Sequence, residues 1–77
     1  MLPAPLTIER LFSEYAGYVA TVVLRVLGRD HEVDDVVQEV FLDAMRGLHA
    51  VHNPAAVREW LKTIAVRKAC RHLRKRR

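Results

Sequence analysis

Lysine and arginine are concentrated at the end of this sequence, and phosphate is the chemical group that such a cluster of cations binds best. Eight of them fall from position 62 onward: Lys62, Arg67, Lys68, Arg71, Arg74, Lys75, Arg76 and Arg77. The negative end of a helix dipole accounts for one or two such cations but not for eight. The segment therefore predicts contact with the phosphates of a nucleic acid, which position a protein on a strand without reading its bases.

The two halves of the chain carry opposite charge. Residues 1–50 contain four basic and eight acidic residues, whereas residues 51–77 contain nine basic residues and a single acidic one, Glu59. The formal net charge of +4 hides this asymmetry. Two different partners are therefore expected, and the basic end is the one suited to nucleic acid.

Four residues have the types that bind zinc but lack its usual spacing. They are His49, His52, Cys70 and His72. An H-x-x-H pair in a loop and a C-x-H pair in a helix match no closed tetrahedral pattern, and C-x-H directs its two side chains apart. We therefore expect no metal site.

Three carboxylates of the acidic half, Asp34, Asp35 and Glu39, have the type of ligand that magnesium prefers. On a helix they spread around the axis, and neither a nucleophile nor a phosphate-binding loop accompanies them. No cofactor and no enzymatic activity are therefore expected.

Apolar residues recur every three to four positions and make up 51% of the chain, while glycine and proline are scarce. This pattern predicts an all-α fold, a compact three- to four-helix bundle. We expect a flexible lead-in over residues 1–6 and one small domain over residues 7–77. The single Cys70 cannot form an internal disulfide, no apolar run reaches the roughly 20 residues of a membrane span, and no signal peptide opens the chain. A cytoplasmic protein is expected.

The first two helices should lie antiparallel. Thr7 can cap a first helix from Ile8, and Gly28 can end it in a left-handed cap. Asp30 can cap a second helix that has His31 and Glu32 in its first turn and ends at Gly47 and Leu48. So short a connection makes the two helices neighbours. One stripe of the first helix should pack on the second: Ile8, Leu11, Phe12, Tyr15, Val19, Val22, Val23 and Val26.

The second helix divides into two faces. Its apolar face consists of Val33, Val36, Val37, Val40, Phe41, Ala44, Met45 and Leu48. Its polar face consists of Asp34, Asp35, Gln38, Glu39, Asp43 and Arg46. Leu42 lies within the polar face, and an apolar residue ringed by charges resembles the centre and rim of an interface. The polar face therefore predicts a docking surface for another protein, with an ordinary solvated face as the alternative.

The third helix should change character along its length, from Pro54, behind the cap Asn53, to about Arg74. A core-facing stripe occupies its first half: Val57, Trp60, Leu61, Ile64 and Ala65. The stripe would continue through Lys68 and His72, which suit a core poorly. The apolar residues of the second half gather on another side: Val66, Ala69, Cys70 and Leu73. The basic residues of the second half share one sector of about 120° around the helix axis: Arg67, Lys68, Arg71, Arg74 and Lys75.

The order of these features resembles region 2 of the bacterial RNA polymerase sigma factors of the extracytoplasmic-function group. The segment DDVVQEVFLDAMR contains the motif D-x-V-Q-E-x-F, followed by Arg46. After a short loop, REWLKTIAVRKACRHLRKRR contains the motif W-L-x-x-I-A, which begins at Trp60. The resemblance covers about residues 8–77. It implies a helical domain without enzymatic activity that docks on the clamp helices of the polymerase largest subunit and opens the promoter.

The resemblance also implies which residues meet each partner. Polymerase contacts would fall on Asp35, Gln38, Glu39, Leu42, Asp43 and Arg46. Contacts to the non-template strand of the minus-ten element would fall on His49, His52, Asn53, Arg58, Lys62, Arg67, Arg71, Arg74 and Lys75. One base of that strand would be flipped into a pocket made by the loop before the third helix and by that helix.

The sequence departs from the family pattern at two positions of the third helix. Family members often have Asn where this chain has Arg67, and frequently Asp where it has Arg71, so the family's pocket chemistry and base preference are not carried over to this chain. Family members also carry a second domain that reads the minus-thirty-five element. These 77 residues do not contain it, so the chain is expected either to be an excised domain or to work without that half. An anti-sigma protein is a further potential partner. Two alternatives remain open, a basic helical protein that binds duplex DNA without polymerase and an interaction module for an acidic protein.

Overall fold

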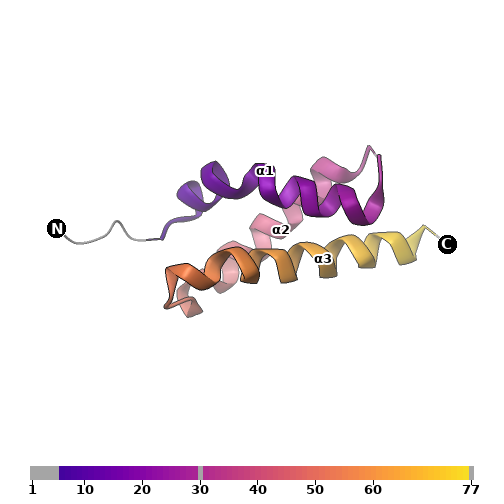
Figure 1. The fold of residues 1–77 in the computed structure, drawn as a ribbon. Coiled ribbons are helices and arrows are strands. Elements are labelled where there is room, and N and C mark those ends of the chain that lie inside the picture. The colour runs from indigo at the N-terminus through magenta and orange to yellow at the C-terminus, as the bar shows by residue number, and fades with distance from the viewer. Residues whose placement is uncertain (1–5, 30, 77) are drawn as a thin grey trace.

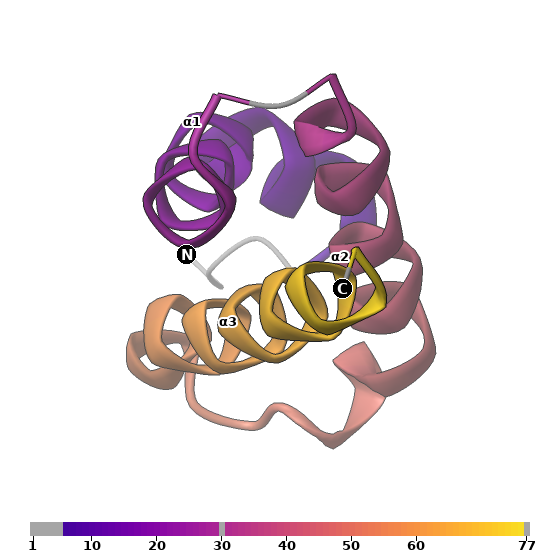
Figure 2. The same cartoon turned by 90° about the vertical axis from the view of Figure 1, so that its right-hand side faces the viewer.

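Three α-helices make up the domain. The computed structural model describes residues 6–29 and 31–76, and over these residues it contains α1 (Ile8–Leu27), α2 (Val33–Gly47) and α3 (Val57–Lys75), with no strand. α1 and α3 run in the same direction, and α2 runs in the opposite direction behind them in the view of Figure 1. Figure 2 shows the three helices around a common centre. The predicted all-α bundle and the antiparallel arrangement of the first two helices are confirmed.

The ends of α1 follow from local hydrogen bonding. The Thr7 hydroxyl accepts a hydrogen bond from the Arg10 backbone N–H at 3.2 Å, which confirms the predicted cap. Gly28 ends the helix at a φ of 74°, and its N–H donates to the Leu24 carbonyl at 2.7 Å. The positive φ was expected, but the ψ of −170° lies outside the left-handed helical region. Glycine is required there because other residues rarely adopt this backbone.

α2 begins and ends differently from the prediction. Glu32 occupies the capping position, but its side chain makes no hydrogen bond to the first backbone N–H groups of the helix. Asp30, the expected cap, lies outside the described residues. The helix ends at Gly47, one residue before the predicted end at Leu48. Leu48–Ala50 form a 3₁₀ turn, where a linker was expected after Leu48.

α3 begins through the cap that the sequence predicts. The Asn53 side chain accepts a hydrogen bond from the Ala55 N–H at 3.0 Å. Pro54–Ala56 then form a 3₁₀ turn that leads into the α-helix at Val57. Proline suits this place because it has no N–H to leave unpaired.

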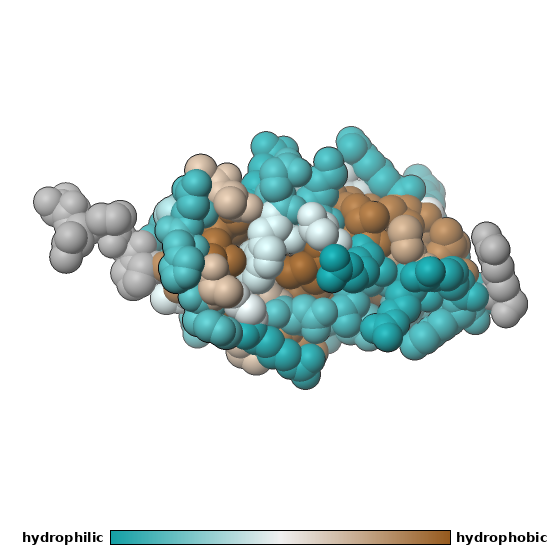
Figure 3. Space-filling view, turned by 90° about the horizontal axis from the view of Figure 1, so that it is seen from below, coloured by the Kyte–Doolittle hydropathy of each residue, from teal (hydrophilic) through white to brown (hydrophobic). Residues whose placement is uncertain are grey.

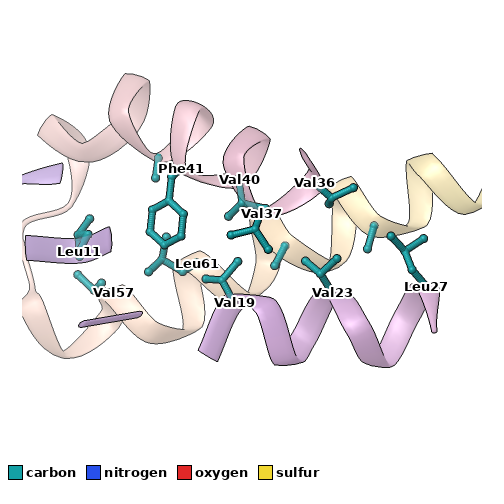
Figure 4. Close-up of a cluster of buried hydrophobic side chains, with 13 residues drawn as sticks. Leu11, Val19, Val23, Leu27, Val36, Val37, Val40, Phe41, Val57 and Leu61 are labelled. Atoms are coloured by element: carbon teal, nitrogen blue, oxygen red, sulfur yellow. The ribbon is translucent and has the colours of Figure 1, made fainter. Parts of the chain in front are cut away.

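All three helices contribute to one apolar core (Figure 4). Its buried members are Leu11, Val19, Val23, Leu27, Val36, Val37, Val40, Phe41, Ala44, Val57, Leu61, Ala65 and Ala69. No polar or charged side chain is buried among the described residues. Nor does any described helix have the length and apolar character needed to cross a membrane.

Two residues expected to face the core are exposed instead. Phe12 of α1 keeps 50% of its surface exposed, and Met45 of α2 keeps 53%. Both belong to the apolar stripes of their helices, but they line a surface hollow between α1 and α2 rather than the core. The bundle therefore leaves part of both stripes uncovered.

The core stripe of α3 also differs from the prediction. Ala69 is fully buried and Leu73 packs against the core, so the stripe continues at four-residue spacing from Leu61 through Ala65. A step of four residues rotates by only about 40°, so the stripe drifts slowly and does not switch sides. Ala69 and Leu73 therefore belong to the core stripe and not to a separate apolar face.

Candidate functional site

An exposed apolar surface joins α1 to α2. Its members are Ile8, Phe12, Gln38, Phe41, Leu42 and Met45, which line a hollow of about 250 Å³ and are called the apolar patch below. Leu42 is 51% exposed. The Phe12 ring meets the Phe41 ring edge to face, with 5.1 Å between their centroids. Exposed apolar side chains gathered in one hollow are typical of a protein-binding surface.

The residues predicted to contact polymerase do not all lie on this patch. Gln38 and Leu42 line it, whereas Asp35 and Arg46 are exposed outside it. Arg46 is 78% exposed at its side chain and pairs with Asp43 at 3.5 Å. The remaining acidic residues of the predicted set face α3.

Carboxylates of α2 meet basic residues of α3 along one seam. The Asp43 Oδ2 atom lies 3.1 Å from the Lys68 Nζ atom. The Glu39 Oε2 atom lies 2.9 Å from the His72 Nε2 atom, and the Glu32 Oε2 atom lies 3.1 Å from the His72 Nδ1 atom. Lys68 and His72 are therefore largely covered, with side-chain exposures of 19% and 20%. We call this row of contacts the α2–α3 seam.

The seam changes the acid–base behaviour of its histidine. Hydrogen bonding to Glu32 first and to Glu39 second raises the pKa of His72 above its ordinary value, against a smaller opposing effect of burial. Both ring nitrogens are donors only in the imidazolium form. The two carboxylates on opposite sides of the ring therefore favour the charged histidine.

Beside the seam, α3 presents a basic concavity. Arg67, Lys68, Arg71 and Arg74 line it together with Asp43 of α2, around a volume of about 320 Å³. We call it the cationic hollow. Three of the residues predicted to contact DNA, namely Arg67, Arg71 and Arg74, are thus brought together by the fold. Oriented guanidinium groups are suited to phosphate oxygens.

The other predicted DNA contacts extend along the exposed side of α3 and the loop before it. Lys62 and Arg67 border a shallow depression with Glu59, Thr63 and Val66. Arg58 lies with its guanidinium carbon 4.6 Å from the ring centroid of Tyr18. The remaining members are exposed: His49, His52, Asn53 and Lys75. Figure 3 shows the molecule from below, the side of α3, with hydrophilic residues over much of that face.

The residue types of a metal site do not come together. Among residues 6–29 and 31–76, no three His, Cys, Asp or Glu side chains are grouped to hold a metal ion. His72 is engaged by Glu32 and Glu39 in the seam. Trp60 is half-buried and packs against the core, in agreement with the interpretation of this residue as a packing residue.

Sequence patterns missed three residues that belong to these surfaces. Phe12 and Met45 were assigned to the core because their helical positions fall on apolar stripes. Tyr18 was assigned no role. A signal existed for Met45, which lies at the edge of its stripe, where coverage depends on how the helices cross. None existed for Phe12, which lies inside its stripe, or for Tyr18, whose contact with Arg58 joins residues 40 positions apart.

These surfaces define a helical binding module, with an apolar patch on α1 and α2 and a cationic surface on α3. The family model described as sigma-70 region 2 matches residues 11–77. The chain therefore belongs to the sigma-70 region 2 family, a domain of a transcription initiation factor involved in binding RNA polymerase and recognising the promoter minus-ten element. Searches of curated proteins and of solved structures found no significant match.

Proposed function

We propose that this chain is the region 2 domain of an extracytoplasmic-function sigma factor that works in the bacterial cytoplasm. In this proposal it docks on the clamp helices of the polymerase largest subunit and captures the non-template strand of the minus-ten element. The observation that carries the proposal is the separation of two exposed surfaces, the apolar patch of α1 and α2 and the basic side of α3. Two surfaces of different chemistry suit two different partners.

Docking is assigned to the apolar patch and the charged residues next to it. Leu42 and Met45 are each about half exposed and stand beside Phe12. Asp35 and Arg46 lie outside the hollow and would form the polar rim of the interface. Fully desolvated apolar anchors with a polar rim are the usual anatomy of a protein interface. Glu39 and Asp43 would contribute from their outer sides, since each already binds a residue of α3.

Strand capture is assigned to the exposed cations of α3 and to the loop at residues 49–53. Phosphate contacts from Lys62, Arg67 and Arg71 would set the position of the strand, whereas the loop and Asn53 would contact bases. Melting then follows from differential binding, because the domain binds unpaired bases and does not bind paired ones. Flipping one base costs about a few kcal/mol, and the new contacts offset this cost.

A panel of oligonucleotides tests the proposal directly. The 77-residue chain is titrated into fluorescently labelled single strands with minus-ten-like sequences, and into the matching duplexes, at one fixed salt concentration. We expect binding to a subset of the single strands and weaker binding to their duplexes. Equal affinity for every oligonucleotide would contradict base capture and would favour a general basic DNA-binding protein.

A pair of charge variants assigns the DNA surface. Arg67→Gln should weaken single-strand binding and lower the logarithmic salt slope by about 0.7. Arg25→Gln removes an exposed cation from α1, outside the proposed surface, and should leave both quantities nearly unchanged. Equal losses in the two variants would mean that net charge alone governs binding.

An anti-sigma protein is a further partner that fits the two surfaces. Such a protein would cover the apolar patch and would compete with polymerase. If the basic side of α3 serves only to bind an acidic protein, short single-stranded DNA will not displace that protein. Displacement by single-stranded DNA supports the sigma-factor assignment instead.

A further inference from the structure

The cationic hollow combines four basic side chains within eight residues of one helix. Arg67, Arg71 and Arg74 fall at i, i+4 and i+7, which places them on one side of α3, and Lys68 completes the lining. Like charges held this close repel one another. An anion that enters the hollow reduces this repulsion, so the positive potential of the hollow favours the binding of an anion.

Among residues 6–29 and 31–76, only one acidic side chain lines the hollow. Asp43 of α2 places its Oδ2 atom 3.1 Å from Lys68 and its Oδ1 atom 3.5 Å from Arg46. Within the described part of the chain, Arg67, Arg71 and Arg74 have no ion-pair partner. The hollow therefore retains a net positive charge after its internal carboxylate is counted.

Asp43 acts on an incoming anion in two ways. Its own charge repels a phosphate placed in the hollow. Its contact with Lys68 also holds that ammonium group, which is only 19% exposed at its side chain, against α2. An entering phosphate must compete with Asp43 for Lys68 or bind without it. The carboxylate is thus an internal counter-ion that weakens binding at this place.

We propose that the cationic hollow binds a phosphodiester of the captured strand and that Asp43 sets the affinity of this site by competing with the phosphate for Lys68. The inference rests on the proposed function and adds to it a named phosphate site with a built-in competitor. The hollow would bind a phosphate group, which could belong either to the strand backbone or to free inorganic phosphate. The volume of the hollow, about 320 Å³, has room for a phosphate group of a strand backbone.

The test uses a strand without a minus-ten sequence, so that base recognition does not enter. An oligothymidylate of about 12 nucleotides is titrated into the wild-type chain and into Asp43→Asn. We expect Asp43→Asn to bind about twofold to fivefold more tightly, which corresponds to the removal of one partly exposed ion pair. The logarithmic salt slope should become steeper by up to about 0.7, because Lys68 becomes available to the strand.

Two further variants keep the test decisive. Asp34→Asn makes the same change in charge at an exposed position of α2 nine residues away, and it should alter the affinity much less than Asp43→Asn does, because salt screens distant charges. Arg71→Gln should weaken binding severalfold and reduce the slope by about 0.7. Equal effects of Asp34→Asn and Asp43→Asn, or wild-type binding by Arg71→Gln, would overturn the inference. Circular dichroism confirms that each variant is folded.

Free phosphate is distinguished in a separate arm. Inorganic phosphate is titrated into Asp43→Asn and followed by the ³¹P resonance, with no saturable binding expected at millimolar concentration. Saturable binding that Arg71→Gln abolishes would assign the hollow to a free anion and overturn the phosphodiester. The panel of minus-ten oligonucleotides tests the proposed function separately. If the chain bound all of those oligonucleotides equally, base capture would be wrong, but the tighter binding of Asp43→Asn to oligothymidylate would still be expected.

Discussion

The Nε2 atom of His72 lies 2.9 Å from the Oε2 atom of Glu39, which joins the second half of α3 to the middle of α2. The other ring nitrogen of His72 meets Glu32, at the start of α2, at 3.1 Å. One imidazole therefore bridges two carboxylates that lie two helical turns apart. This bridge attaches to the bundle the part of α3 that carries the cationic hollow.

The bridge should make stability depend on pH. The pKa of His72 is raised in the folded state above the ordinary value of about 6.5, so the folded state binds more protons than the unfolded state. Its contribution is fully present below about pH 6.5 and is lost as pH rises through the folded pKa. We expect the free energy of unfolding, measured in urea at several pH values, to fall over that window in the wild type. His72→Gln should lack this component.

His52→Gln is the matched control. His52 is exposed in the loop before α3 and has no hydrogen bond among the described residues. Its replacement should leave the pH profile of the wild type in place. An identical decline in His72→Gln and in the wild type would show that other groups cause it.

Leu42→Asp should preserve the fold and abolish docking on polymerase. Leu42 is 51% exposed, so the new carboxylate meets water in the free domain, and surface changes of this kind usually alter stability by less than about 0.5 kcal/mol. In the complex the same charge would be buried against an apolar partner. Pull-down with a fragment that contains the clamp helices measures the loss, and thermal melting checks the fold. A collapse of the melting temperature would show that Leu42 belongs to the core.

Phe12 extends the same prediction to α1. Phe12→Ser removes an exposed ring from the apolar patch and should weaken docking, although no sequence motif singles this residue out. Leu61→Ala provides the contrast, because Leu61 is fully buried and its truncation should cost about 2–5 kcal/mol of stability. A Phe12→Ser variant that docks like the wild type would confine the interface to α2.

Much of the fold could be predicted because local patterns carry it. Three-to-four residue periodicity marked all three helices, and Thr7 and Asn53 marked two of the starts. The positions of Phe12 and Met45 could not be predicted in the same way. An apolar stripe is wider than the strip of it that packs against a neighbouring helix. The angle at which the helices cross decides which part of the stripe is covered. That crossing depends on residues far apart in the chain.

The candidate site shows the same division. Helical phase alone placed Leu42 outside the core, and its exposure is confirmed. The basic sector of α3 was also predicted as one surface, but Lys68 of that sector turns toward α2, as does His72, which lies outside the sector. Their partners Asp43 and Glu39 are 25 and 33 positions away in the sequence. Periodicity describes one helix at a time and contains no information on which opposite charges will meet.

Two glycines give a final prediction on packing, because both lie in helices and only one is crowded. A Cβ at Gly17 would meet nothing within 4 Å, so Gly17→Ala should stabilise the domain by about 0.5–1 kcal/mol through helix propensity. A Cβ at Gly47 would lie 3.2 Å from the Cζ2 atom of Trp60. Gly47→Ala should therefore gain less stability than Gly17→Ala, since the indole must shift to admit the methyl group.

Urea unfolding measures the change in the free energy of unfolding for both variants. Trp60 is the only tryptophan, and its fluorescence in the folded state should change in Gly47→Ala alone. Equal stabilisation with unchanged fluorescence would mean that Trp60 does not pack against the end of α2.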